Sequence, residues 1–180
     1  MVYINAISSN ATLTTDVKEL IPNALLRRRM SEIVKSGVSV GMECINKVGA
    51  EKIDAIITAT GLGCLADSEK FLKIILDNNE ELLNPTPFIQ STFNTVGGQI
   101  ALMCKNHSYN MTYTHRGTSF EAALLDAVSL IENADAENVL LGAFDYNTPT
   151  LVDVLGRLRP WQGKTIGEGA FFFVLSKEKN

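Results

Sequence analysis

The residues around position 117 have the pattern of a strand that turns sharply into a helix, with glycine at the turn. A polar and aromatic run ends at His115, Gly117 follows, and a long apolar helix pattern begins at Thr118. A buried helix that starts just after such a turn often carries a nucleophile or an anion site at its N-terminus. Glycine has no side chain that could act as a nucleophile. The sequence therefore predicts the architecture of a reactive site at Gly117 without its reactive group.

Two side chains near Gly117 are candidates for a substitute nucleophile and base. Ser119 follows the glycine by two residues, and His115 precedes it by two. A serine–histidine pair needs hydrogen-bond contact and usually a third group that orients the histidine. The sequence places no acidic residue for that task. Hydrolase or acyltransferase chemistry at Ser119 and His115 is therefore kept as an alternative.

Thr118 has a structural interpretation. Thr118 and Glu121 have the spacing of a capping box, in which the two side chains accept hydrogen bonds from amides at the helix start. Such a role makes Thr118 less suitable as a nucleophile. The helix that follows carries one apolar stripe and further apolar residues on its other faces, so we expect it to be buried nearly all round. The stripe consists of Phe120, Ala123, Leu124, Ala127, Val128 and Ile131.

Residues 61–66 match a dinucleotide-binding fingerprint. Gly61, Gly63 and Ala66 fit the pattern G-x-G-x-x-A, which follows a strand and opens a helix. However, the preceding strand is the second of the chain, and no strand ending in an acidic residue follows at the required distance. An isolated fingerprint is not specific. We do not expect a nucleotide site here.

Composition and charge exclude several classes. A net charge of −4 gives no basic surface for nucleic acid, and no apolar run is long enough to span a membrane. His107 and His115 lack the local spacing of a metal site, and we expect neither metal nor cofactor. Cys44, Cys64 and Cys104 are odd in number and far apart, which suits buried thiols in a reducing cytoplasm.

Strands and helices alternate along the chain. This alternation predicts one domain over residues 1–180, with a three-layer α/β/α fold and a mixed, mostly parallel five-stranded sheet whose last strand is antiparallel. Gly37 and Gly41 lie on or near one helical stripe, and we expect them to permit close packing against a neighbour. We expect strands over 2–7, 53–60, 110–115, 139–144 and 171–175, and helices over 26–48, 67–77, 88–104, 118–132 and 148–158.

From about residue 25 onward, the chain resembles the N-terminal half of β-ketoacyl synthases, in the thiolase-like superfamily. The resemblance depends on several segments in the right order. They are Arg29-Met30-Ser31, Asn94-Thr95-Val96-Gly97-Gly98-Gln99-Ile100-Ala101, the strand and helix on either side of Gly117, Val139-Leu140-Leu141-Gly142-Ala143, Arg159-Pro160-Trp161, and Gly167-Glu168-Gly169-Ala170. The sequence is most similar to the group found in bacterial aryl-polyene, dialkylresorcinol and flexirubin-type pathways.

Two departures from the family pattern bear on function. The resemblance places Gly117 at the position of the catalytic cysteine, so no side chain can carry an acyl thioester. Family members continue into a second half that supplies two histidines, a lysine and part of the oxyanion hole. The sequence ends at Asn180 without counterparts of these residues. We therefore expect that the chain does not catalyse condensation by itself.

The resemblance implies an accessory protein that assembles with itself or with a full synthase. Chain-length factors of polyketide systems also lack the cysteine and bind a competent synthase. The expected pairing edge is the strand before Gly117, from Tyr109 to Thr114. A further alternative is an acyl-chain binding module, whose pocket would involve Phe93, His115, Gly117, Thr118 and Ser119. Arg27, Arg28 and Arg29 are candidates for docking a partner such as acyl-carrier protein.

Overall fold

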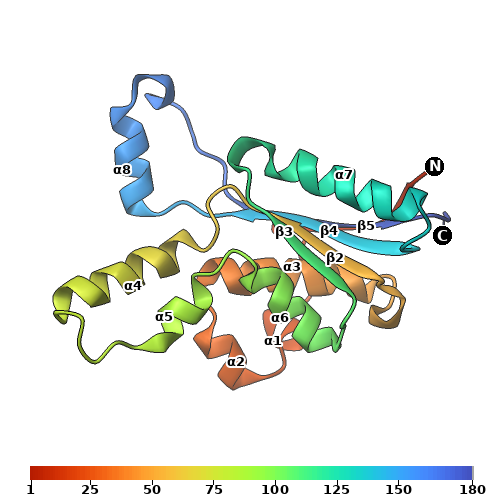
Figure 1. The fold of residues 1–180 in the computed structure, drawn as a ribbon, viewed down its shortest axis with the longest axis horizontal. Coiled ribbons are helices and arrows are strands. Elements are labelled where there is room, and N and C mark those ends of the chain that lie inside the picture. The colour runs from red at the N-terminus through yellow and green to blue at the C-terminus, as the bar shows by residue number, and fades with distance from the viewer. Residues whose placement is uncertain (180) are drawn as a thin grey trace.

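The computed structural model describes residues 1–179, and these residues form one five-stranded sheet (Figure 1). Its strands are β1 (Tyr3–Ser9), β2 (Ala55–Ala59), β3 (Tyr109–Tyr113), β4 (Asn138–Asp145) and β5 (Gly169–Ser176), in the order β1-β5-β4-β2-β3. β2 is parallel to both β3 and β4, whereas β5 is antiparallel to β4 and β1. Only the last strand therefore runs against the others, which confirms the predicted sheet.

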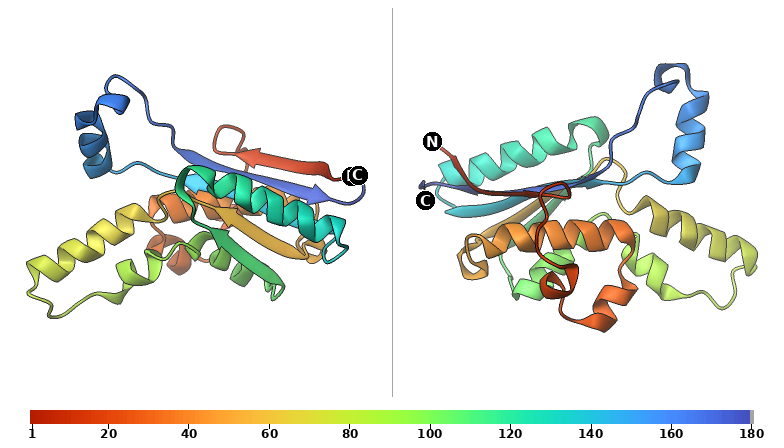
Figure 2. Two further views of the ribbon diagram at one scale, coloured as in Figure 1. Left: turned by 45° about the horizontal axis from the view of Figure 1, so that its top comes forward. Right: turned by 180° about the vertical axis from the view of Figure 1, so that it is seen from behind.

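Helices cover both faces of the sheet and confirm the three layers (Figures 1 and 2). One face is covered by α7 (Ser119–Glu132), and the other by α3 (Glu32–Asn46) and α6 (Thr95–Cys104). The short helices α1 (Val17–Leu20) and α2 (Ala24–Arg29) lie outside α3. Among residues 1–179, none of the helices combines the length and the hydropathy that a membrane span requires.

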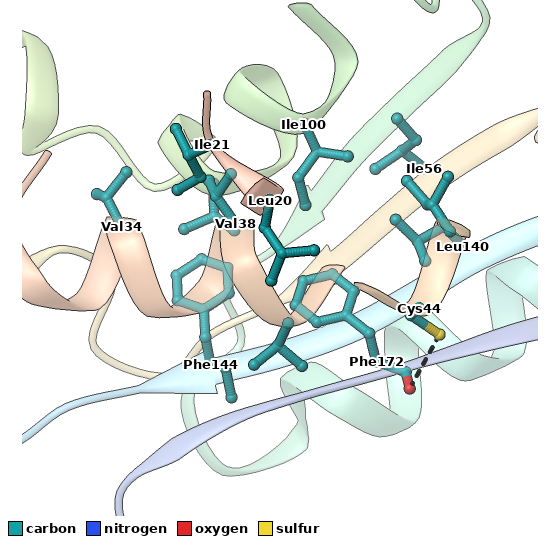
Figure 3. Close-up of a cluster of buried hydrophobic side chains, with 14 of the residues drawn as sticks. Leu20, Ile21, Val34, Val38, Cys44, Ile56, Ile100, Leu140, Phe144 and Phe172 are labelled. Atoms are coloured by element: carbon teal, nitrogen blue, oxygen red, sulfur yellow. Dashed lines mark hydrogen bonds between the residues drawn. The ribbon is translucent and has the colours of Figure 1, made fainter. Parts of the chain in front are cut away.

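The larger cluster of buried side chains lies between α3, α6 and the sheet (Figure 3). Phe144 and Phe172 from adjacent strands fill its centre. Cys44 is buried among them, with its thiol 3.5 Å from the carbonyl oxygen of Phe172. Burial raises the pKa of Cys44 to about 12. Cys44 and Cys64 are thus buried small side chains, as predicted, and Cys104 is half-buried.

Gly37 and Gly41 allow α3 and α6 to pack closely, as their spacing predicts. A Cβ atom on Gly41 would lie 2.5 Å from Cδ1 of Ile100, and one on Gly37 would lie 2.9 Å from Cγ1 of Val96. Both neighbours belong to α6. The loss of helix propensity at the two glycines is therefore offset by contact between the helices.

Gly142 in β4 makes a still closer contact. A Cβ atom there would lie 2.1 Å from two ring atoms of Phe172, whose side chain is fully buried. We expect Gly142→Ala to lower the free energy of unfolding by about 1–2 kcal/mol, because the ring has no free space to move into. Urea denaturation measures this. Gly98→Ala is the matched control, since nothing lies within 4 Å of its Cβ position, and an equal loss in both variants would contradict the interpretation.

Two of the expected helices are interrupted. The pattern over 26–48 is divided between α2 and α3, because Met30 and Ser31 adopt extended backbone angles. The pattern over 88–104 is divided into α5 (Pro85–Gln90) and α6, and α6 continues through Gly97 and Gly98 without a break. Near this second break, the hydroxyl groups of Ser91 and Thr95 donate to backbone carbonyls of α5, so they compete with the helical pattern.

Two parts of the chain extend from the end of the sheet. α4 (Leu65–Asp77) with α5 forms one arm, and α8 (Pro149–Arg157) with the turn that follows forms another (Figures 1 and 2). Both arms expose large apolar side chains. Such surfaces commonly mark contacts with other proteins.

Candidate functional site

The candidate site lies where the carboxyl ends of the parallel strands β2, β3 and β4 meet (Figure 1). Residues 60–63 follow β2, residues 114–118 lead from β3 into α7, and Asp145 ends β4. Ligands and reactive groups of α/β proteins usually lie at this end of a parallel sheet.

The turn between β3 and α7 contains an unusual backbone conformation, but not at the glycine. Arg116 has a φ of +55°, in the left-handed region, and begins the short 3-10 turn Arg116–Thr118. Gly117 has no such φ, is exposed, and has no heavy atom within 4 Å of a built Cβ. Neither conformation nor lack of space therefore requires glycine at this position. A side chain is missing where one would fit.

Ser119 is buried and stabilises this turn by hydrogen bonds. It is 3% exposed, and its hydroxyl lies 2.9 Å from the carbonyl oxygen of Thr60 and 2.8 Å from that of Arg116. The single hydroxyl proton is thus directed at backbone acceptors and not at a base. This arrangement joins the end of β2 to the start of α7.

His115 and Thr118 lie on the exposed side of the turn. The ring of His115 lies beside Tyr113, with centroids 6.0 Å apart. Among the described residues, no hydrogen bond joins it to Ser119, so the structure does not bring the two candidates together. A serine–histidine mechanism requires a hydrogen bond between the two side chains, and this requirement is therefore not met.

The predicted capping box is wrong, although Thr118 does precede the first residue of α7. The Thr118 hydroxyl donates to the carbonyl oxygen of His115 at 3.2 Å, and its side chain makes no bond to the helix amides. With φ −115° and ψ 13°, Thr118 lies outside the extended region that aims a capping side chain at the helix. The hydroxyl therefore turns back into the loop, and Glu121 stays exposed.

The glycine-rich loop after β2 holds an internal carboxylate. Asp145 Oδ1 accepts hydrogen bonds from the Thr60 hydroxyl at 2.7 Å, the Gly61 amide at 3.1 Å and the Leu62 amide at 2.8 Å. Its Oδ2 accepts from the Gly61 amide at 2.9 Å. The amides that would bind a pyrophosphate in a dinucleotide site are therefore bound to Asp145, and the fingerprint has a structural role here.

Two neighbours of this loop complete the site. Phe93 lies over Gly63, where a Cβ would be 2.5 Å from its ring, and Gly63 has a φ of +63° that suits glycine. The structure thus places Phe93 at the glycine loop. The closest thiol, Cys64, is buried, and burial with the nearby carboxylates of Asp67 and Asp145 raises its pKa to about 12. Cys64 is thus unsuited to nucleophilic chemistry.

The edge strand β3 is adjacent to this site. It runs from Tyr109 to Tyr113, one residue short of the predicted Thr114, and exposes Tyr109 and Met111. The Tyr109 hydroxyl donates to Asp126 of α7 at 3.0 Å. Strand β3 lacks proline, lysine and any bulge, which are the usual protections of an edge strand.

The three arginines lie in the last turn of α2, away from the glycine loop. Arg27 donates to the backbone carbonyl of Ile21, so it has a structural contact. Arg28 and Arg29 are exposed. These two remain free to meet an acidic partner.

An α/β/α fold in which β3 turns sharply into α7 at the carboxyl end of the parallel strands is that of a thiolase-like protein. A family model for the β-ketoacyl synthase N-terminal domain matches residues 5–157. The chain belongs to this family. No curated protein matches the sequence.

Solved structures with similar folds share little sequence with the chain. One is a chain from the ketosynthase ApeO in complex with its chain length factor ApeC, from Xenorhabdus doucetiae, with a TM-score of 0.76 and 19% identity over 99% of this chain and 80% of that one. The ishigamide ketosynthase/chain length factor gives 0.77 and 16% over 91% of this chain and 48% of that one. A chain from the AntDE:AntF complex, described as a type II PKS acyl-carrier protein with its ketosynthase, gives 0.74 and 18% over 97% and 62%. The chain thus spans about half to four fifths of these structures, and the likeness confirms the fold.

Proposed function

We propose that this protein is an accessory, non-condensing member of the β-ketoacyl synthase family, which acts by assembly with a synthase-like subunit or with itself. The observation that carries the proposal is the turn at Gly117. Its backbone and its bracing hydrogen bonds are complete, yet the position of the family's nucleophile has no side chain. The site is retained as structure, which suits a subunit whose partner performs the chemistry.

The proposed setting is fatty acid- or polyketide-type biosynthesis, of the aryl-polyene or a related kind, in the cytoplasm. Support comes from the family and from fold neighbours whose titles describe a ketosynthase with its chain length factor and a ketosynthase with acyl-carrier protein. Three free cysteines suit a reducing compartment. Arg28 and Arg29 give acyl-carrier protein a docking surface of complementary charge.

Acylation tests whether the chain has chemistry of its own. We expect no mass increase when the wild-type protein is incubated with acyl-loaded acyl-carrier protein and measured by intact-mass spectrometry. Acylation of Ser119 or any other side chain would refute the non-condensing role and favour the transferase alternative. Binding of a free acyl chain without acylation would instead favour a binding module.

Gly117→Cys provides a second test, because the structure has room for the side chain. We expect the new thiol to react with iodoacetamide, as an exposed cysteine should, while the purified variant still shows no condensation of an acyl and a malonyl carrier-protein substrate. The wild type, whose Cys44 and Cys64 are buried, is the labelling control. Measurable condensation by the variant alone would overturn the proposal.

Assembly is tested at the two edges of the sheet. We expect the chain to co-purify with a co-expressed, cysteine-containing ketosynthase of the same family, and Met111→Asp on β3 to abolish this. Ile4→Asp on β1 is the matched control, because Ile4 is also an exposed apolar residue on an edge strand. Loss of binding in Ile4→Asp but not in Met111→Asp would place the interface at β1 and contradict β3 as the pairing edge.

A further inference from the structure

The edge strand β3 has a defined face toward a partner. The carbonyl of Tyr113 accepts the amide of Thr60, the residue after β2, at 3.0 Å, so the backbone groups of Tyr113 point toward β2 and the interior of the sheet. Because backbone direction alternates along a strand, the groups of Asn110 and Thr112 point outward. A second strand that uses the full length of β3 in antiparallel pairing would therefore centre on Met111, with Asn110 opposite Thr112 of the other copy if the chain paired with itself.

Asp126 stands above the centre of this edge. Tyr109 and Tyr113 lie on either side of Met111 on the same face of the strand, and the hydroxyl of Tyr109 donates to Asp126. Burial and Asp126 raise the pKa of Tyr109 to about 12 and also raise that of Tyr113. Both tyrosines therefore stay neutral donors beside the Asp126 carboxylate.

Asp126 forms no ion pair within the described part of the chain, in which Arg157 and Asp153 form the one pair. Strand β3 and helix α7 contain no lysine or arginine, whereas α7 contains Glu121, Asp126 and Glu132. A half-buried carboxylate beside two aromatic rings is an environment that favours a cationic side chain from outside.

Neither β3 nor α7 of a second copy would supply that cation. A two-fold axis through Met111, perpendicular to the sheet, would put both α7 helices on the same face and both Asp126 carboxylates at the same level beside the axis. The only further groups that a second copy brings near it from β3 and α7 are neutral or acidic. Like charges in this position oppose association, and a partner with a lysine or arginine there relieves the repulsion.

We propose that Asp126 makes the β3 edge select a different, cation-bearing subunit over a second copy of this chain. The partner is a synthase-like protein whose strand or helix at the shared axis presents a lysine or arginine to the cluster of Tyr109, Tyr113 and Asp126. This inference rests on the proposed function, because it takes β3 as the pairing edge. It adds the choice between a heteromer and a homodimer.

Sedimentation velocity at micromolar concentration tests the charge selection. We expect the wild type to be mainly monomeric and Asp126→Asn, which keeps an acceptor for Tyr109, to self-associate at least about tenfold more tightly. An equimolar mixture of wild type and Asp126→Lys should associate more tightly than either alone, and added salt should weaken this. The mixture of wild type with Glu121→Lys is the matched control, because Glu121 is an exposed acid on the same helix, and it should stay monomeric.

Hydrogen exchange separates the failure of this inference from that of the proposed function. In the mixture with Asp126→Lys, the amides of Asn110 and Thr112 should become protected. A wild-type dimer that protects these amides and is as tight as that of Asp126→Asn overturns the charge selection but leaves the β3 edge of the proposed function intact. A mixed dimer that leaves these amides unprotected refutes β3 as the pairing edge. That result would overturn the charge selection together with the β3 edge of the proposed function. No dimer in any sample overturns the charge selection, while co-purification with a ketosynthase would still support the proposed function.

Discussion

Replacement of Glu43 by glutamine is expected to lower the free energy of unfolding near neutral pH by about 3 kcal/mol. Glu43 lies in α3 and is 4% exposed. Its Oε1 accepts hydrogen bonds from the amides and hydroxyls of Thr14 and Thr15 at distances of 2.9 to 3.2 Å. Its Oε2 is buried without a partner in the described residues. In glutamine, an NH₂ group replaces one of the two oxygens. At the position of Oε1 it would face four donors, and at the position of Oε2 it would find no acceptor.

The same contacts make stability depend on pH. Burial acts to raise the pKa of Glu43, but the hydrogen bonds from Thr14 and Thr15 outweigh it and lower the pKa from 4.5 to about 2. Because the pKa is lower in the folded state, the ionised group stabilises the fold fully above pH 4.5 and loses this effect as the pH falls from 4.5 toward 2.

Urea denaturation of wild type and Glu43→Gln at about pH 7 and about pH 3 measures both effects. The difference in free energy of unfolding should be smaller at the lower pH. Glu32→Gln is the matched control, since Glu32 is an exposed acid in the first turn of the same helix, and it should change stability by less than about 1 kcal/mol. A pH-independent loss in Glu43→Gln would contradict the interpretation.

The order of strands and helices could be predicted because their burial patterns are strong and local. The fully buried β2 has the β-branched run of a central parallel strand. α7 forms where its apolar stripe predicts, but the expectation that it is buried nearly all round is wrong, because Leu125 is 69% exposed. The breaks at Met30 and Ser91 could not be predicted in this way. Leu26 and Met30 contact the same core as α3, so the apolar spacing continues across the break at Met30 and does not reveal it. Near Ser91, the break accompanies a hydrogen bond from the serine hydroxyl to the backbone carbonyl of Phe88.

Less of the candidate site than of the fold could be predicted from the sequence. The glycine at 117 could be recognised from its family position, but the role of Ser119 depends on Thr60, which is distant in sequence. Asp145 was missed altogether, because its contacts with Thr60 and Leu62 form only when β4 lies beside β2. One signal was available: an acidic residue at the end of the strand next to a glycine-rich loop can bind the loop's amides.

Asp145→Ala is expected to lower the free energy of unfolding by about 2–3 kcal/mol and to loosen the turn at Gly117. The substitution leaves the amides of Gly61 and Leu62 without their acceptor. The effect should reach the turn, because a Cβ on Gly61 would lie 3.3 Å from the carbonyl oxygen of Arg116, and the adjacent Thr60 accepts the hydroxyl of Ser119. The carboxylate thus holds three strand ends in one arrangement.

Hydrogen exchange and cysteine labelling detect this coupling separately from global unfolding. In Asp145→Ala, amides of residues 60–63 and 115–120 should exchange faster than those of β4 and β5 under native conditions. In the Gly117→Cys background, the substitution should also change the rate of alkylation at position 117. Asp77→Ala, at the exposed end of α4, is the control and should leave both readouts unchanged. If exchange rises only at residues 60–63, then Asp145 stabilises the glycine loop alone, and the turn that lacks the family's nucleophile is held by Ser119 without it.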